Sequence, residues 1–206
     1  MKNTVVVLIS VILAVSITVS SGINNPDVFE LIKADLGQAV CVRFEILTTI
    51  ESTVFDVVDS AKGLAVIAAD GRFNVIIGQD QYIYDSKHLF SYSKINNQVI
   101  VETPTDSETV MGDISFITNI DEWYHTRVVM RNKQYRLVRK DSLSSDIPDS
   151  MTVYVSESSK NIDSLIFFDI NDDRNVIYFS SQNLSDTCDE QLFVPSFPDS
   201  TDIVRF

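Results

Sequence analysis

Residues 63–104 alternate short runs of β-forming residues with turn residues, and this pattern constrains the fold more than any other part of the chain. Val, Ile, Phe and Tyr dominate the runs, whereas Gly, Asn, Asp and Ser stand between them. The turn residues recur at Asp70-Gly71, Gly78, Asp85-Ser86 and Asn96-Asn97. This spacing predicts a meander of antiparallel strands joined by tight turns.

Strand patterns also precede and follow the meander. Apolar residues alternate with Cys41, Arg43 and Glu45 across residues 40–46, which indicates a strand with one buried face. A second strand is expected at residues 53–61. After Trp123, β-type runs resume at residues 124–130, 134–139, 151–156, 164–169, 176–179 and 191–194. We therefore expect about eleven strands.

Two regions show helical features instead. Asn25 is a suitable N-cap for a helix that Pro26 opens and Gly37 ends. Residues 110–120 carry apolar side chains at helical spacings, which indicates one or two short amphipathic helices. Since a long antiparallel sheet tends to curl, we expect a mainly β (α+β) fold. It would be a single incomplete antiparallel β-barrel covered by short helices.

The first 22 residues have the layout of a secretory signal peptide. Lys2 precedes an almost wholly apolar run at residues 5–15, and small residues follow at 16–22. An uncleaved membrane anchor is the alternative, but the run is shorter than the ~20 residues that span a bilayer. Because no linker-like composition divides the remainder, we expect one domain over residues 23–206 of an exported protein.

Cys41 and Cys188 are the two cysteines of the chain. In an oxidising compartment they could form a disulfide that fastens the first strand to the last segment. A redox or metal-binding pair is a second interpretation, although CxxC-type spacing is absent. Two free buried thiols are the third, because the sequence gives no distance between the two residues.

Charge and missing motifs narrow the possible functions. The chain carries 16 basic and 29 acidic side chains, a formal net charge of −13, which argues against nucleic-acid binding. Zinc-protease, nucleophile-elbow, dinucleotide-binding and P-loop motifs are absent. We therefore expect no catalytic residue, no cofactor and no metal site, and a protein that is not an enzyme. The basic stretch at residues 127–140 is explained most simply as the solvent face of a hairpin, with an acidic lipid or partner as the alternative.

A more specific pattern runs through the meander. It comprises Gly63, Phe73-Asn74, the run DSKHLFSY at residues 85–92, and Gln98-Val99. These residues resemble the LolA family of periplasmic carriers of outer-membrane lipoproteins. The similarity covers most of the chain after residue 22 and extends to the closing segment, residues 193–204. It implies an incomplete β-barrel whose helices cover a hydrophobic cavity for acyl chains.

The resemblance, together with the period of two in the strands, suggests which residues form this cavity. The expected cavity residues are Phe44, Phe73, Val75, Ile77, Phe90 and Tyr92. The expected lid residues are Met111, Ile114 and Ile117. Many members of the family hold the lid with an Arg, but Ala68-Ala69 stand at that place here. Arg72, which lies nearby, is therefore the candidate latch.

The implied function is that of a periplasmic carrier, which shields lipoprotein acyl chains and moves them from the inner to the outer membrane. Its expected partners are lipoproteins, an ATP-driven release complex of the inner membrane and an outer-membrane acceptor, and we expect a monomer that binds no nucleic acid. One alternative is an envelope module of the same fold that binds another amphiphile without handing it over. A structural β-protein without a ligand is the other.

Overall fold

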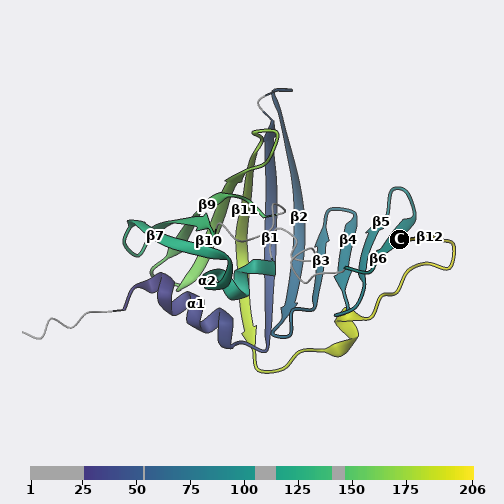
Figure 1. Cartoon of the computed structure of the whole chain (residues 1–206), viewed down its shortest axis with the longest axis horizontal. Coiled ribbons are helices and arrows are strands. Elements are labelled where there is room, and N and C mark those ends of the chain that lie inside the picture. The colour runs from purple at the N-terminus through teal and green to yellow at the C-terminus, as the bar shows by residue number, and fades with distance from the viewer. Residues whose placement is uncertain (1–25, 53, 105–114, 141–146) are drawn as a thin grey trace, which may run out of the picture.

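Figure 1 shows the computed structural model of the chain, which describes residues 26–52, 54–104, 115–140 and 147–206. The expected signal peptide at residues 1–22 lies outside the described residues, as do the expected lid residues Met111 and Ile114.

The described residues form one twelve-stranded sheet, in the order β12-β6-β5-β4-β3-β2-β1-β11-β10-β9-β8-β7. Neighbouring strands are antiparallel, except that β12 runs parallel to β6. The strands are β1 (Cys41–Ser52), β2 (Val57–Ala68), β3 (Phe73–Ile77), β4 (Asp80–Tyr84), β5 (Leu89–Ser93), β6 (Gln98–Glu102), β7 (Tyr124–Met130), β8 (Gln134–Arg139), β9 (Ser150–Ser156), β10 (Asn161–Phe168), β11 (Arg174–Ser185) and β12 (Asp202–Arg205). The sheet curls without closing, because β7 and β12 are its two edges. The expected incomplete antiparallel β-barrel with short helices is confirmed.

The meander forms where the turn residues predicted it. Gly71, Gly78 and Asn97 have φ angles of 88°, 60° and 46°, in the left-handed region that Gly and Asn enter most readily. The four strands β3 to β6 that these turns separate are each five residues long. One difference lies before them, where β2 is a single long strand instead of the two shorter runs expected at residues 53–61 and 64–67.

Helix α1 (Val28–Gln38) begins later than expected, because Asp27 is its N-cap and accepts a hydrogen bond from the backbone N–H of Phe29 (3.0 Å). The Tyr135 hydroxyl, which accepts a hydrogen bond from Asn132 N–H, donates to the same Asp27 carboxylate. The helix continues one residue past Gly37. These contacts tie the start of α1 to the β7–β8 hairpin.

Further on, the expected helical region contains the 3₁₀ helix η2 (Ser115–Asn119) and α2 (Ile120–Trp123). Together with α1, these helices cover one face of the sheet, which we call the inner face. Phe29 stacks on Tyr135 with ring centroids 4.6 Å apart, and Phe116 meets Tyr124 edge to face at 5.4 Å. The buried inner cluster includes Phe44, Phe73, Val75, Leu137, Leu165 and Ile177. Each such side chain contributes ~1.5–3 kcal/mol when it is fully removed from water.

Residues 186–201, which we call the C-terminal strap, cover part of the opposite, outer face over β1 to β6. In the strap, η3 (Glu190–Phe193) replaces the strand that was expected at residues 191–194. Phe193 packs with Cys41, Val66 and Ala68 in a second, smaller apolar cluster. The strap ends in β12, which joins the sheet beside β6. The described chain therefore has two apolar layers, one on each face of the sheet.

Candidate functional site

The inner face over β3, β4 and β5 has a side-chain arrangement that the strand register defines. Phe73 lies opposite Tyr84, and Val75 lies opposite Tyr82. Leu89 of β5 in turn pairs with Tyr84. Since paired residues of antiparallel strands project to the same side, these five residues share the inner face.

These side chains are only partly covered. Phe73 and Val75 are buried in the inner cluster, whereas Ile77, Tyr84 and Leu89 pack against it but stay partly exposed. Figure 1 shows α1 and α2 beside β7 to β11, with β3 to β6 on the other side of β1 and β2. The described helices therefore leave a half-exposed apolar surface on the inner face of β3 to β6.

A separate pocket of about 590 Å³ lies where the end of β8, the start of β9 and the β10–β11 turn meet. Ile147 and Phe167, which belong to the inner cluster, contribute apolar walls. Its charged groups include Arg139 and Asp149, which form an ion pair at 2.5 Å. Pockets of ~300–1,000 Å³ are typical of small-molecule sites. The pocket therefore combines apolar side chains that belong to the core with several charged groups.

Four of the expected cavity residues lie on the inner face. Phe44 contacts Phe179 there, with ring centroids 5.0 Å apart. The prediction that Phe73, Val75 and Ile77 share one apolar face is confirmed by their register and by their place in or against the inner cluster. That any of these residues contacts a ligand stays a prediction.

Phe90 and Tyr92 lie elsewhere, and the expectation that they share a cavity wall with Phe73 is wrong. Phe90 pairs with Ile83 of β4, which alternates with the inward-facing Tyr84. Both rings pack on Phe197 of the C-terminal strap, at centroid distances of 6.2 Å and 5.1 Å. They belong to the outer face because the strap, and not the helices, covers them.

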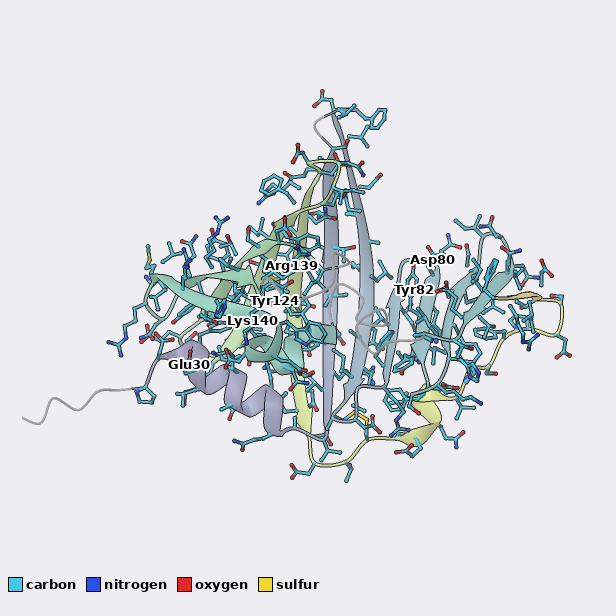
Figure 2. All side chains as sticks on the ribbon, in the orientation of Figure 1. Glu30, Asp80, Tyr82, Tyr124, Arg139 and Lys140 are labelled. Carbon is cyan, nitrogen blue, oxygen red and sulfur yellow. A yellow bond between two sulfur atoms is a disulfide. The ribbon has the colours of Figure 1, made fainter. Side chains whose placement is uncertain are left out.

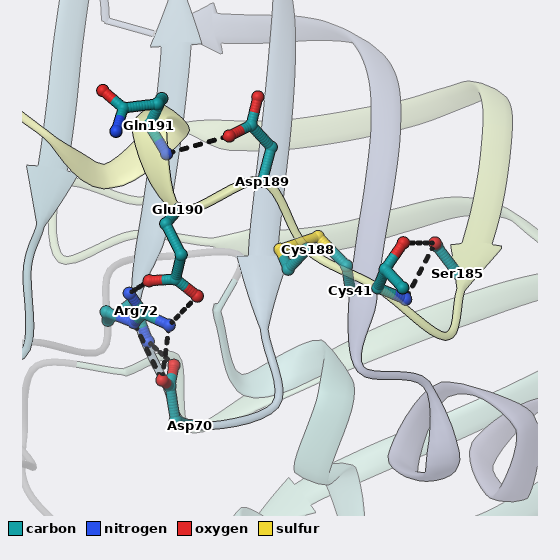
Figure 3. Close-up of a disulfide and its surroundings, with 9 residues drawn as sticks. Cys41, Asp70, Arg72, Ser185, Cys188, Asp189, Glu190 and Gln191 are labelled. Carbon is teal, nitrogen blue, oxygen red and sulfur yellow. Dashed lines mark hydrogen bonds and ion pairs between the residues drawn. A yellow bond between two sulfur atoms is a disulfide. The ribbon is translucent and has the colours of Figure 1, made fainter.

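The lid residue that the structure describes, Ile117, is buried in the inner cluster. Arg72, the candidate latch, does not contact η2 or α2 through any ion pair or hydrogen bond found among the described residues. Its guanidinium pairs with Asp70 and Glu190 (Figure 3). It also lies over the Phe193 ring, 4.9 Å from the centroid. The hydrogen bond from Arg72 holds the pKa of Glu190 below its usual value. Among the described residues, Arg72 therefore fastens the C-terminal strap, and its role as a latch for the lid stays a prediction.

The expected disulfide is present. Cys41 at the start of β1 is bonded to Cys188 in the strap, 147 residues later (Figure 3). Of the three interpretations of the cysteine pair, the structure thus supports the first. Asn74 adds a hydrogen bond to the main-chain oxygen of Leu192 (2.6 Å), so β3 also holds the strap. All of these contacts lie on the outer face.

The basic stretch is engaged mainly within the chain. Arg136 donates to Ser150, Arg139 pairs with Asp149, and Lys140 donates to the main-chain oxygen of Asp121. This pattern fits the simpler interpretation, in which these residues are the charged side chains of a hairpin.

Several residues of the half-exposed surface were not singled out from the sequence, namely Asp80, Tyr82, Tyr84, Leu89 and Ile100. The sequence did contain information that could have identified these residues. The tight turns fix the register of the hairpins, and this register could have been extended from Phe73 across β4 and β5.

Comparisons with known proteins show that the fold also occurs in a solved structure. No family model matches the chain, and no curated protein matches it either. Among solved structures, the chain is similar to an uncharacterized conserved protein from Thermus thermophilus, with a TM-score of 0.51 and 11% identity over 86% of this chain and 99% of the other. At this identity the similarity shows a common fold and nothing finer.

Lower scores are found for two further structures. A DUF1329 family protein from Desulfovibrio piger gives a TM-score of 0.47 with 8% identity, covering 81% of this chain and 95% of that one. A LolA superfamily protein from Nitrosomonas europaea gives 0.45 with 10% identity, covering 83% and 99%. Within the described ranges, no helix combines the length and hydropathy needed to cross a bilayer.

Proposed function

We propose that this chain is a periplasmic carrier that shields the acyl chains of lipoproteins on its inner face and moves them from the inner to the outer membrane. The observation that carries this proposal is the half-exposed apolar surface of β3 to β5, where Ile77, Tyr84 and Leu89 pack against the core without being fully covered. The sequence resemblance of the meander to the LolA family supplies the class of cargo.

The physical requirement for such a carrier is simple. Each acyl CH₂ group that leaves water gains ~0.8 kcal/mol, so a lipid anchor does not cross an aqueous compartment unshielded. The same surface must also release the acyl chain, so it must bury that chain less fully than a protein core buries its side chains. A partly covered apolar face on an unclosed sheet meets both demands, and binding and release need no chemical change of the cargo.

A fluorescent fatty-acyl probe tests the binding step, and β3 supplies a matched pair of variants. Ile77 and Ile76 are adjacent isoleucines that point to opposite faces of the sheet. Ile77→Gln is expected to weaken probe binding about ten-fold, since a polar amide replaces an apolar contact worth ~1.4 kcal/mol or more. Ile76→Gln, on the outer face, should leave binding unchanged. Equal binding by both folded variants would argue against the inner face as the site.

The transfer of a lipoprotein from the inner membrane to this chain is tested by a separate experiment. We propose as partners an ATP-driven release complex in the inner membrane and an acceptor in the outer membrane, with the carrier acting as a monomer. Membranes that contain a lipoprotein-release complex should deliver a lipoprotein to the purified chain in the presence of ATP, as a one-to-one complex on gel filtration. Probe binding without any such transfer would favour the amphiphile-binding module without hand-over. A chain that binds no probe would instead favour the structural β-protein.

A further inference from the structure

The inner face of β3 to β6 and β12 changes from apolar to polar along the strands. At one end, Phe73, Tyr84 and Leu89 form a row of paired apolar side chains, which Glu102 of β6 continues opposite Leu89. At the other end, a parallel row contains Ile77, Asp80, Ser93, Gln98 and Asp202. Tyr84 is four steps along β4 from Asp80, a distance of roughly 13 Å at ~3.3 Å per residue. The surface is therefore amphipathic along the strand direction.

The polar end is also acidic. Asp80 and Asp202 lie at this end by register, and Glu102 lies opposite Leu89 at the other end of the same face. No Lys or Arg occupies an inward-facing position of β3 to β6 or β12. Gln98 donates to Asp202 (3.0 Å), which confirms that these two side chains share a face. Arg205 alternates with the inward position 204 and so lies on the outer face. A negatively charged head group would be repelled here.

Asp80 carries a second, independent feature. One of its carboxylate oxygens is inaccessible to solvent and has no hydrogen-bond partner within the part of the chain that the structure describes. A buried acceptor without a donor costs ~1–3 kcal/mol, and more when it is charged. Figure 2 shows Asp80 and Tyr82 following one another along β4. Asp80 as a whole is only half-buried, so a ligand that brings a positive charge to its exposed part would offset the charge that this partial burial leaves without a partner.

We propose that the inner face binds an amphiphile with a positively charged amine head group, whose ammonium contacts Asp80 while its apolar chain lies on Ile77, Tyr84 and Leu89. This inference rests on the proposed function, because it specifies the ligand class of the same surface. The ammonium has three donors and a compact charge, and the aromatic ring of Tyr82 on the same face favours a cation further.

Displacement of a bound fluorescent acyl probe by three C12 amphiphiles tests the proposal. Dodecylamine, dodecanol and dodecanoate share one chain and differ in head-group charge, being positive, neutral and negative at neutral pH. We expect dodecylamine to compete about ten-fold better than dodecanol and dodecanoate to compete worst. Added salt should narrow these differences, because it screens the partly exposed charges.

Two variants and one control variant locate the effect on the protein. Asp80→Asn should abolish the advantage of dodecylamine over dodecanol while leaving the affinity for dodecanol unchanged. Glu45→Gln removes the same charge from the outer face, where Glu45 alternates with the inward-facing Phe44, and should alter neither. Asp202→Asn, at an exposed position, serves as a second test that does not risk the fold.

The outcomes separate the two proposals. If dodecanol and dodecylamine displace the probe equally, the head-group inference is overturned while the carrier function stands. If the preference persists in both Asp80→Asn and Asp202→Asn, its assignment to this face is overturned. If the chain binds neither the probe nor any of the three amphiphiles, the proposed function itself fails.

Discussion

Removing the disulfide between Cys41 and Cys188 should destabilise the whole protein, because the bond closes most of the described chain into one loop. The two cysteines are 147 residues apart. In the chain-entropy treatment, a cross-link over a loop of that length stabilises the folded state by about 5 kcal/mol, and removal of native disulfides typically costs ~2–5 kcal/mol. Domains of this size are stable by only ~5–15 kcal/mol, so the loss should be easy to measure.

The variant to use is the double substitution Cys41→Ala and Cys188→Ala, since Cys41 is buried in the outer apolar cluster and Ser would place a hydroxyl there. Urea denaturation should show a free energy of unfolding ~2–5 kcal/mol below that of the oxidised protein, and the reduced protein should behave like the variant. Hydrogen exchange should rise first in the C-terminal strap. An unfolding free energy within ~1 kcal/mol of the oxidised protein would refute the view that this bond restricts the unfolded chain.

Four further substitutions test individual contacts. Gly63→Ala should cost ~1–3 kcal/mol in denaturant unfolding, because its Cβ would lie 2.4 Å from a main-chain oxygen of β3, whereas Gly37→Ala in α1, whose nearest contact would be 3.5 Å away, should gain ~0.5–1 kcal/mol. Arg72 lowers the pKa of Glu190, so their contact stabilises the strap fully above pH 4.5 and is lost as the pH falls through the lowered value. The stability difference between wild type and Arg72→Leu should therefore shrink on acidification, and a constant difference would contradict this. Burial and the neighbouring Asp27 carboxylate raise the pKa of Tyr135 to about 12. The hydrogen bond from the Tyr135 hydroxyl to Asp27 therefore stabilises the folded protein fully below pH 10, and this stabilisation is lost as the pH rises toward 12. An ultraviolet titration should show this late ionisation, and Tyr135→Phe should cost ~1–2 kcal/mol.

The local structure of the meander was predictable because its turns carry their own chemistry. Asn97 and Gly78 stand at positions with positive φ, and such residues are recognisable in a sequence. The strands between them follow the expected period of two. By contrast, the segment at residues 191–194 has β-type composition yet forms η3, because Asp189 caps it and Phe193 must reach the outer face. This is a tertiary requirement that local composition does not contain.

The candidate site was predictable only in part, for a similar reason. A period of two shows that Phe90 and Tyr92 share one side of their strand, but it does not show which side faces the helices. Their cover is Phe197, more than 100 residues later in the chain. The strap reaches them because it is held on the outer face by Cys188 and Glu190. The partial burial of the outer face of β5 therefore depends on a segment that sequence patterning does not link to it.

Because Phe73 is deeply buried, a substitution at this position tests the stability of the fold before it tests ligand binding. Its side chain is only 4% exposed and lies in the inner cluster, with its ring 5.8 Å from that of Tyr84. Loss of a buried Phe costs ~3–5 kcal/mol, and an unpaired buried carboxylate adds several kcal/mol more. Phe73→Glu should therefore abolish cooperative folding in thermal denaturation, and any loss of probe binding would follow from unfolding. Ile77, which is partly exposed, is the position at which binding can be changed without this loss. A Phe73→Glu protein that melts like the wild type would mean that water reaches this part of the inner face.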